Sequence, residues 1–311
     1  MKTAFLFPGQ GAQAVGMGKD VYEAFDAAKA MFEKADGLTG LPLRKLCFEG
    51  PEEELARTDI AQPAIFTVSA IMLQCMKQVA GSQKFAAIAP TSMAGLSLGE
   101  YTALYAAGAM DFETGLKLVM RRGQLMQQAA TAVPSGMVSV MGLDEAKAQE
   151  LCKAAGDGQV LACANFNCPG QIVLSGQIDA CKRAEALAKD FGASGAIPLK
   201  VAGAFHSEIM APAAQELGVA LAEVNFAQPS VDVISNVDAT PYVCCCQISQ
   251  KLLAQLTKPV RWQQSIEALL AGGVERFYEI GPGRVLAGLM RRINRKTEVI
   301  SVNSKDAIEK L

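Results

Sequence analysis

The sequence predicts an α/β protein in which a parallel sheet covered by helices is interrupted by a small second unit. Apolar runs that fit buried strands alternate with segments of helical spacing in both the first and the last third of the chain. The stretch Gly95-Leu96-Ser97-Leu98-Gly99 has the form of a strand–turn–helix nucleophile elbow. Between about residues 137 and 201 the order of elements changes to β-α-β-β-α-β, the ferredoxin-like pattern.

The composition is that of a compact protein. Of its 311 residues, 50% are hydrophobic and 19% are charged, and the net charge of −2 favours neither nucleic acid nor an anionic membrane as partner. The apolar run at the N-terminus is too short for a signal peptide, and no stretch approaches 18 consecutive apolar residues. We therefore expect a cytoplasmic protein with no membrane span.

Nine cysteines are scattered through the chain, and without a secretory signal we expect all of them to be reduced thiols. Cys244, Cys245 and Cys246 are adjacent, but in an extended segment their side chains point to alternate sides and cannot close on one ion. We expect packing in a loop or strand there, and no metal site.

The first third of the chain is predicted to start the parallel sheet. A polar, glycine-rich loop at residues 8–13 directly follows the first strand, which is where α/β proteins place groups that face a ligand. Pro63 fits the first position of a helix that Gly81 ends, and Asp111 fits an N-cap. The predicted elements are a strand at Thr3–Phe7, helices at Val21–Ala35 and Pro63–Val79, a strand at Thr91–Ala94, the elbow helix up to Gly108, and a long helix from Asp111 to about Ala132.

The elbow predicts a nucleophile at Ser97. Glycines stand on both sides of the serine because a Cβ would clash in so tight a turn, and the turn exposes the serine hydroxyl. Leu98, Tyr101, Leu104 and Tyr105 then recur at helical spacing. The pattern is weak alone, because a glycine-rich turn that opens a helix has the same form.

The middle of the chain is predicted to form a small domain that walls one side of a cleft. Turn signals near residues 156–158, 167–170 and 192 separate its elements. These elements are strands at Met137–Met141, Val160–Phe166, Gln171–Ser175 and Ala196–Val201, and helices at Asp144–Ala155 and Gln177–Phe191. We predict an α/β-hydrolase-like large domain over residues 1–132 and 202–311, and a ferredoxin-like small domain over 133–201.

His206 is the only histidine of the chain and stands in Gly203-Ala204-Phe205-His206-Ser207, where the chain returns to the large domain. A lone histidine is usually structural, but a nucleophilic Ser97 needs a base and no other histidine exists. The remaining predicted elements are helices at Glu208–Val224, Ser249–Thr257, Trp262–Ala271 and from Gly283 to Ile293, and strands at Val231–Ser235, Phe277–Ile280 and Val299–Val302.

Over essentially its whole length the chain resembles the malonyl-CoA:acyl carrier protein transacylases, acyltransferases of fatty acid and polyketide synthesis. The resemblance is carried in order by Phe7-Pro8-Gly9-Gln10-Gly11, the elbow with Glu100-Tyr101, Arg122-Gly123, residues 203–207, Pro259-Val260-Arg261-Trp262 and Gly281-Pro282-Gly283. It implies malonyl-CoA and phosphopantetheinylated acyl carrier protein as substrates, with no bound cofactor and no metal. One departure is Leu96, where a histidine is common in the family.

The resemblance also implies roles for individual residues. Ser97 matches the nucleophile and His206 the general base, while a backbone carbonyl that matches Gln255 orients the imidazole. Gln10 and Leu98 match the backbone N–H donors of the oxyanion hole. Arg122 matches the arginine that binds the malonyl carboxylate in bidentate fashion, and Phe205 fits the malonyl-selecting version of its motif.

Several alternatives remain at this point. A serine hydrolase would share the elbow but release its acyl group to water, and a binding module for acyl-CoA or carrier protein would lack turnover. A discrete acyltransferase of a polyketide synthase would have the same chemistry with a different carrier. We expect acyl carrier protein as the partner of a monomer, with Lys200, Arg291 and Arg292 as candidates for docking an acidic carrier.

Overall fold

The computed structural model describes all 311 residues and contains the two predicted sheets. The larger sheet has five strands that are all parallel. Their order is β7 (Asp232–Ile234), β2 (Ser92–Gly95), β1 (Lys2–Phe7), β8 (Val274–Ile280) and β9 (Val299–Val302). The prediction of an interrupted parallel sheet is confirmed.

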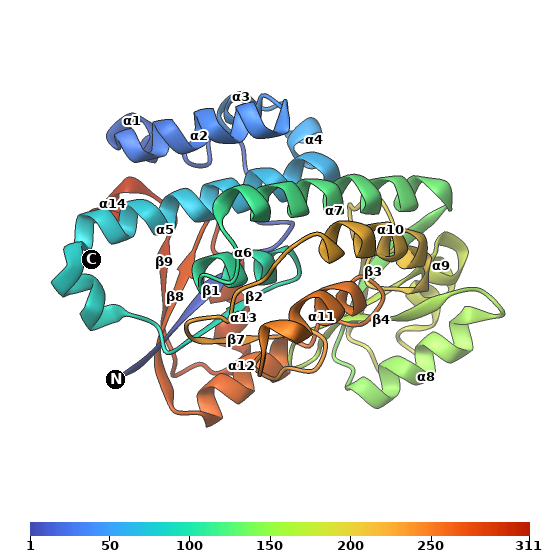
Figure 1. The fold of residues 1–311 in the computed structure, drawn as a ribbon. Helices are drawn as coiled ribbons and strands as arrows, with labels where there is room; N and C mark the ends of the chain where they lie inside the picture. The colour runs from blue at the N-terminus through green and yellow to red at the C-terminus, as the bar shows by residue number, and fades with distance from the viewer.

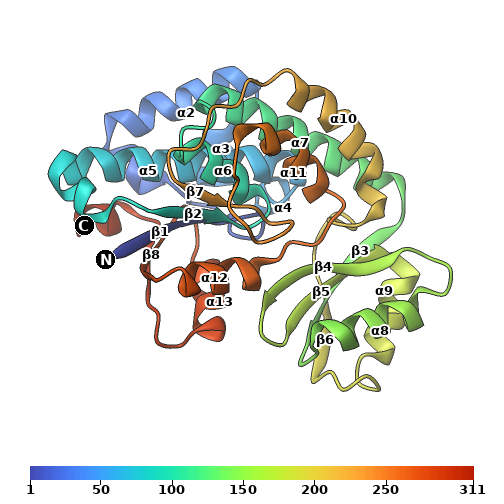
Figure 2. The same cartoon turned by 60° about the horizontal axis from the view of Figure 1, so that its bottom comes forward.

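Helices cover both faces of the parallel sheet, so its central strand is buried on both sides. Phe5 and Phe7 of β1 point into one apolar cluster, whereas Ala4 and Leu6 point into another, and all four are fully buried. Figure 2 shows the two helical layers. One layer contains α5 (Thr58–Ile88), α6 (Leu98–Ala106), α7 (Phe112–Ala132), α10 (Ala211–Ala222) and α11 (Ile248–Gln255), and the other contains α12 (Trp262–Ala271) and α13 (Val285–Ile293).

An outer group of short helices lies across α5 and α7 (Figure 1). It consists of α1 (Lys19–Ala24), α2 (Asp26–Thr39), α3 (Leu43–Glu49) and α4 (Glu52–Leu55), and α14 (Lys305–Glu309) ends the chain. The single helix predicted at Val21–Ala35 is therefore wrong: Phe25 has an extended backbone (φ −126°, ψ 124°) that separates α1 from α2. The Phe25 ring packs against the large core, and this tertiary contact overrides the local helical pattern.

The core helix α5 is longer than the sequence predicts. It begins at Thr58, five residues before Pro63. The predicted stop at Gly81 is confirmed, because Gly81 has a non-helical backbone (φ 62°, ψ 174°), and a second helical stretch follows this kink up to Ile88. Packing explains the early start, because every residue from Ile60 to Leu73 is buried. α5 is also the one helix long and apolar enough to cross a membrane, but 72% of its most apolar window is buried inside the fold, as in a core helix.

The smaller sheet is antiparallel and has the ferredoxin-like topology. Its strand order is β4 (Leu161–Cys168), β5 (Gln171–Gln177), β3 (Ser135–Met141) and β6 (Gly195–Pro198). The helices α8 (Glu145–Gly156) and α9 (Ile178–Leu187) pack on one face of this sheet and form a separate apolar cluster with it. The predicted order of β-α-β-β-α-β is confirmed.

A backbone clasp joins the edge strand β4 to the loop between α11 and α12. Val260 N–H donates to Ala164 O at 2.8 Å, and Phe166 N–H donates to Val260 O at 2.9 Å. Arg261 also pairs with Glu145 of α8 at 3.4 Å. The small sheet is therefore attached to the rest of the protein at a further point besides its two chain connections. This point lies about 60 residues after Val201, where the chain leaves the small sheet.

The cysteine prediction needs one correction. Cys244 and Cys246 form a disulfide across Cys245, because the chain bends between them into a short 3₁₀ turn and brings their Cα atoms to 5.2 Å. The expected alternation of an extended segment does not hold there. The other seven cysteines are free thiols.

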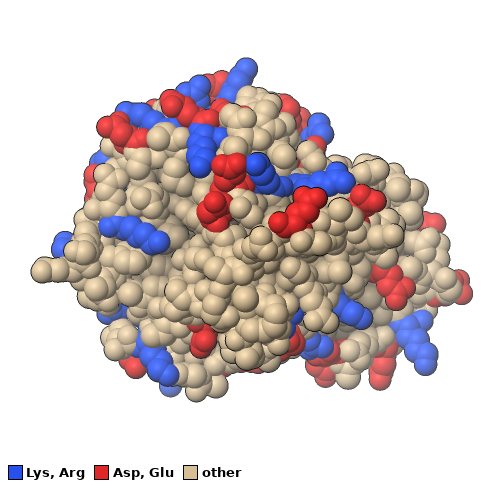
Figure 3. Space-filling view, in the orientation of Figure 1, with Lys and Arg blue, Asp and Glu red and all other residues tan.

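Charged side chains of both signs are interspersed on the surface. Figure 3 shows a broad area without charges across the middle of one face, with lysine, arginine, aspartate and glutamate mostly around its margins. This mixture agrees with the net charge of −2.

Candidate active site

The nucleophile elbow forms as predicted, between β2 and α6. Ser97 has a positive φ (φ 52°, ψ −102°) at the turn, a backbone conformation that residues other than glycine rarely adopt. The two flanking glycines are required by close approach: a Cβ on Gly95 would lie 1.9 Å from Gly99 C, and one on Gly99 would lie 2.1 Å from Phe7 O. The turn is therefore pressed against β1 with no room for a side chain.

Replacing Gly99 with alanine is expected to disrupt the elbow, because the new Cβ would meet backbone atoms that cannot move aside. An overpacked core costs roughly 1–3 kcal/mol or more, and here the contact is with a central strand. We expect a lower denaturant midpoint and a loss of Ser97 reactivity toward a fluorophosphonate probe. The matched control is Gly37→Ala on α2, which has open space around it; equal effects of the two changes would contradict the prediction.

Ser97 and His206 lie in hydrogen-bond contact. The Ser97 Oγ–His206 Nε2 distance is 2.8 Å, and His206 Nδ1 lies 2.7 Å from Gln255 O. A carbonyl oxygen can only accept, so Nδ1 carries the proton and the lone pair of Nε2 faces the serine hydroxyl. Burial lowers the pKa of His206 to about 4, with a further contribution from the Arg122 cation, so the imidazole is neutral at pH 7.

Arg122 projects from α7 into the same site and is 1% exposed. Its guanidinium donates to Gln62 Oε1 at 2.7 Å, to Gln255 Oε1 at 2.8 Å and to Ser97 Oγ at 3.0 Å, while Nε has no partner. All three acceptors are uncharged. A buried cation with an unpaired N–H beside the Ser97 hydroxyl has the geometry to bind an anionic group.

These groups open into a cavity of about 280 Å³ between the two sheets. Gln10 and Leu96 line it from the large sheet, Asn165 and Val173 from the small sheet, and Phe205 from the segment that connects them. The structure thus brings together Ser97, His206, Arg122, Gln10 and Phe205, together with the Gln255 carbonyl. Leu98 provides the first amide of α6 directly behind Ser97.

The basic residues predicted for carrier docking are placed differently from one another. Lys200 lines the mouth of the cavity, whereas Arg292 donates to Gln171 Oε1 at 2.9 Å and Arg291 is exposed on α13. Only Lys200 of the three contacts the cavity.

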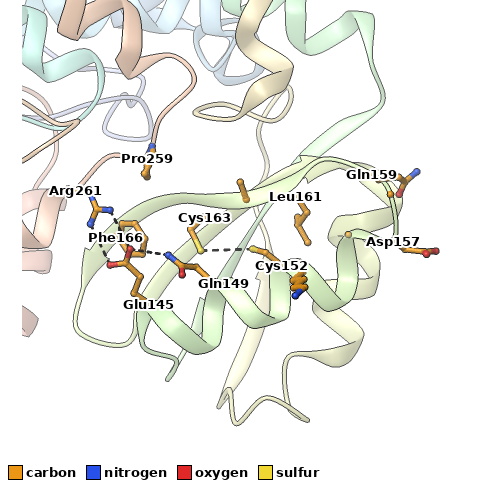
Figure 4. Close-up of a pocket in the computed structure, with 14 residues that line it drawn as sticks. Glu145, Gln149, Cys152, Asp157, Gln159, Leu161, Cys163, Phe166, Pro259 and Arg261 are labelled. Atoms are coloured by element: carbon orange, nitrogen blue, oxygen red, sulfur yellow. Dashed lines mark hydrogen bonds and ion pairs between the residues drawn. The ribbon is translucent and has the colours of Figure 1, made fainter.

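A second hollow lies on the small sheet and has a volume of about 530 Å³ (Figure 4). It contains the ion pair of Arg261 with Glu145, and the thiols of Cys152 and Cys163 lie 4.0 Å apart in it. No serine or histidine lines this hollow. It is larger than the cavity at Ser97, but it has no counterpart of the contact between Ser97 and His206.

Sequence analysis missed four side chains of the site. Asn236 Oδ1 accepts from Ser97 N–H at 2.7 Å, and Asn236 Nδ2 donates to Gly95 O at 2.8 Å, so it holds two backbone groups of the elbow. Gln62 contacts Arg122, and Glu100 and Tyr242 form a buried pair behind the elbow. Glu100 follows the elbow directly in the sequence, and this position could have drawn attention to it. Asn236, Gln62 and Tyr242 carry no local sequence signal, because their partners are 60 to 142 residues away in the chain.

No group of three histidine, cysteine, aspartate or glutamate side chains is arranged to hold a metal ion. The acidic residues that are buried, Glu100 and Glu279, have hydrogen-bond donors as partners instead.

Residues 4–305 match the family of acyl transferase domains. The malonyl CoA-acyl carrier protein transacylase of Bacillus subtilis (strain 168) is 45% identical over 309 residues, which are 99% of this chain and 95% of that protein. The crystal structure of an acyl carrier protein S-malonyltransferase from Vibrio cholerae superposes with a TM-score of 0.93 at 41% identity. The superposition covers 100% of this chain and 99% of the Vibrio cholerae chain. A malonyl-transacylase in complex with a type II polyketide synthase acyl-carrier protein superposes with a TM-score of 0.94 at 38% identity, over 99% of this chain and 98% of that one.

Proposed function

The chain belongs to the acyl transferase family, and from that premise we propose that it transfers the malonyl group of malonyl-CoA to the phosphopantetheine thiol of acyl carrier protein through a malonyl ester on Ser97. The observation that carries this proposal is Arg122, a buried cation 3.0 Å from the nucleophilic oxygen with no carboxylate as partner. Malonyl-CoA brings a carboxylate two carbons from the carbon under attack. A site for uncharged acyl groups has no need of this cation.

In the first half-reaction, Ser97 Oγ attacks the thioester carbon while its proton passes to His206 Nε2, which lies 2.8 Å away. The Gln255 carbonyl holds the Nδ1–H and stabilises the imidazolium. We assign the oxyanion to the backbone N–H groups of Gln10 and Leu98, each worth about 2.7–4 kcal/mol at such a site. The carbon–sulfur bond then breaks, and His206 returns the proton to the departing CoA thiolate.

In the second half-reaction the same groups act in reverse. His206 takes the proton of the phosphopantetheine thiol, and the sulfur attacks the malonyl ester. The carbon–oxygen bond breaks, and Ser97 recovers the proton. The two half-reactions balance with one serine and one imidazole, so the proposal includes ping-pong kinetics and no metal or cofactor. It also needs no second copy of the chain, since all the named residues belong to one chain.

Arg122 also separates this proposal from a serine hydrolase. By holding the malonyl carboxylate it fixes the acyl group where an incoming thiol, guided by its pantetheine arm, reaches the ester better than water does. We propose fatty acid synthesis as the pathway. The similarity to a transacylase that binds a polyketide carrier supports a discrete polyketide acyltransferase as the alternative, with the same chemistry and another carrier.

We propose the domain division given by the sequence, with residues 133–201 as the small domain. It is supported by the separate apolar cluster of the small sheet. The cavity lies between the two sheets, so substrate would bind at the domain boundary. The monomeric state and the cytoplasmic location remain predictions.

The test is the intact mass of the protein after brief incubation with malonyl-CoA. A malonyl adduct that forms on the wild type and not on Ser97→Ala, and that pantetheine discharges faster than water, supports transfer. An adduct that water discharges equally fast points to a hydrolase. A folded wild type without any adduct refutes the proposal.

The reactivity of Ser97 should persist in acid. The burial that lowers the pKa of His206 to about 4 keeps the imidazole neutral, and so able to accept a proton, far below the ordinary value of 6.5. We expect the rate of Ser97 labelling by a fluorophosphonate to stay level from pH 7 to about 5 and to fall only near pH 4. Circular dichroism at each pH controls for unfolding; an inflection near pH 6.5 would show that the imidazole is not desolvated.

A further inference from the structure

A buried carboxylate that the proposed reaction does not use lies directly behind the elbow. Glu100 is in the first turn of α6 and is completely buried. Its Oε1 accepts from Tyr242 OH at 2.5 Å, and its Oε2 accepts from Gln255 Nε2 at 2.6 Å and from Asn236 N–H at 3.2 Å. Burial raises the pKa of Glu100 to about 7, against the opposing effect of these donors. So costly a group is expected to have a definite task.

The side chain of Gln255 connects this carboxylate to the reacting groups. Its Nε2 donates to Glu100 and also to Ser97 O at 2.9 Å, and its Oε1 accepts from Arg122 at 2.8 Å. Its backbone carbonyl accepts from His206 Nδ1 at 2.7 Å. One residue at the end of α11 therefore contacts the nucleophile's backbone, the base and the buried cation.

Glu100 and Arg122 together determine which way the Gln255 amide points, because one can accept from its NH₂ group and the other can only donate to its oxygen. In its ionised form the carboxylate can only accept hydrogen bonds, so it draws the NH₂ end of the amide toward α6 and leaves the oxygen for Arg122. With the amide reversed, an oxygen would face the carboxylate and the NH₂ group would face the guanidinium, and both contacts would be repulsive. Without the carboxylate, Gln255 Nε2 would keep only two uncharged acceptors, Ser97 O and Asn236 Oδ1. These hold the NH₂ group in the observed orientation less strongly than a charged oxygen does.

We infer that Glu100 is a positioning residue of the acyl transfer site: it fixes Gln255, and through Gln255 it sets the places of the His206 imidazole and the Arg122 guanidinium around Ser97. The inference rests on the proposed function for the identity of the acyl group. A small displacement of such groups lowers a rate strongly, by up to about 10²-fold for 1 Å. Glu100 acts without touching substrate.

The experiment measures single-turnover malonylation of Ser97 in four variants: Glu100→Ala, Glu100→Gln, Gln255→Ala and the double variant of both alanines. Gln255→Ala removes the linking amide but keeps the backbone carbonyl. Glu279→Ala is the matched control, because Glu279 is also a buried carboxylate that accepts two backbone N–H bonds, from Leu286 and Ala287, and it does not contact Gln255. The rate of fluorophosphonate labelling is recorded for all of them.

We expect Glu100→Ala to lower the maximum acylation rate by about 30- to 100-fold, with the half-saturating malonyl-CoA concentration changed by less than about threefold. Glu100→Gln keeps one acceptor for Gln255 and should restore the rate to within about threefold of the wild type. In the double variant, the second alanine should add less than about threefold, because both changes break the same link. Glu279→Ala should lower stability only.

A folded Glu100→Ala protein with a wild-type rate overturns the inference, as do losses that multiply in the double variant or an equal loss in Glu279→Ala. If Glu100→Ala does not fold, Gln255→Ala decides: a wild-type rate overturns the inference, and a fall of tenfold or more supports it. If the wild type accepts no malonyl group, the proposed function has failed, and the fluorophosphonate rates of the same variants still test the role of Glu100.

Discussion

Asparagine in place of His206 should lower the rate of Ser97 malonylation by about 10³-fold, within the 10²–10⁴ range of a positioned general base. Asparagine tolerates the left-handed backbone of this residue (φ 56°), and its amide N–H can still reach the Gln255 carbonyl. It offers no basic lone pair to Ser97 Oγ. The chain has no other histidine that could substitute. The measurement is single-turnover acylation followed by intact mass.

Chemical rescue distinguishes a lost base from a disturbed site. Alanine at position 206 would leave an imidazole-sized space next to the existing cavity, so added imidazole should recover part of the rate lost in this variant. Imidazole should have no effect on the asparagine variant, in which the side chain fills that space. If His206→Asn acylates within about tenfold of the wild type, His206 is not the base.

Alanine in place of Arg122 should reverse the acyl preference. The malonyl carboxylate loses charge-assisted hydrogen bonds worth about 1.5–3 kcal/mol each, and two of them correspond to roughly 10²- to 10⁴-fold in the acylation rate. Acetyl-CoA carries no carboxylate, so its acylation rate should fall by less than about tenfold. The measurement is the ratio of malonyl to acetyl adduct formed from an equimolar mixture.

Arg122→Lys is the matched control, since it keeps the charge but not the planar pair of donors. We expect it to recover less than about a tenth of the wild-type preference for malonyl. The alanine variant should also raise the pKa of His206, because the Arg122 cation is one cause of its low value. An unchanged malonyl-to-acetyl ratio in Arg122→Ala would remove this residue from substrate binding.

Much of the site could be predicted from the sequence because its main parts have local signals. The elbow is a five-residue pattern, and His206 stands out because it is the only histidine. Arg122 and the Gln255 carbonyl came from the family resemblance alone, since an arginine on a helix is usually solvated and a carbonyl has no sequence signal. The groups that hold these residues in place were largely invisible: Tyr242 meets Glu100 across 142 positions of the chain.

The fold shows the same division between local and distant causes. The two sheets follow from periodicity and turn residues, and the elements of the small sheet occur in the predicted order β-α-β-β-α-β. The break at Phe25 and the early start of α5 depend on packing against a core that the local sequence does not describe. The disulfide between Cys244 and Cys246 depends on a short 3₁₀ turn, whereas the sequence predicts a loop or strand there.

The clasp between Val260 and β4 affects how the small domain could be exchanged between relatives. A graft of residues 133–201 alone would place the β4 strand of one protein against the residue 260 loop of another. The two backbone hydrogen bonds at Ala164 and Phe166 would then form only if the foreign strand and the native loop align in the same register. A chimera that also carries residues 258–261 would bring both halves of this contact from one parent, including the Arg261–Glu145 pair. The unit of recombination is thus discontinuous in sequence, and its second piece is only four residues long.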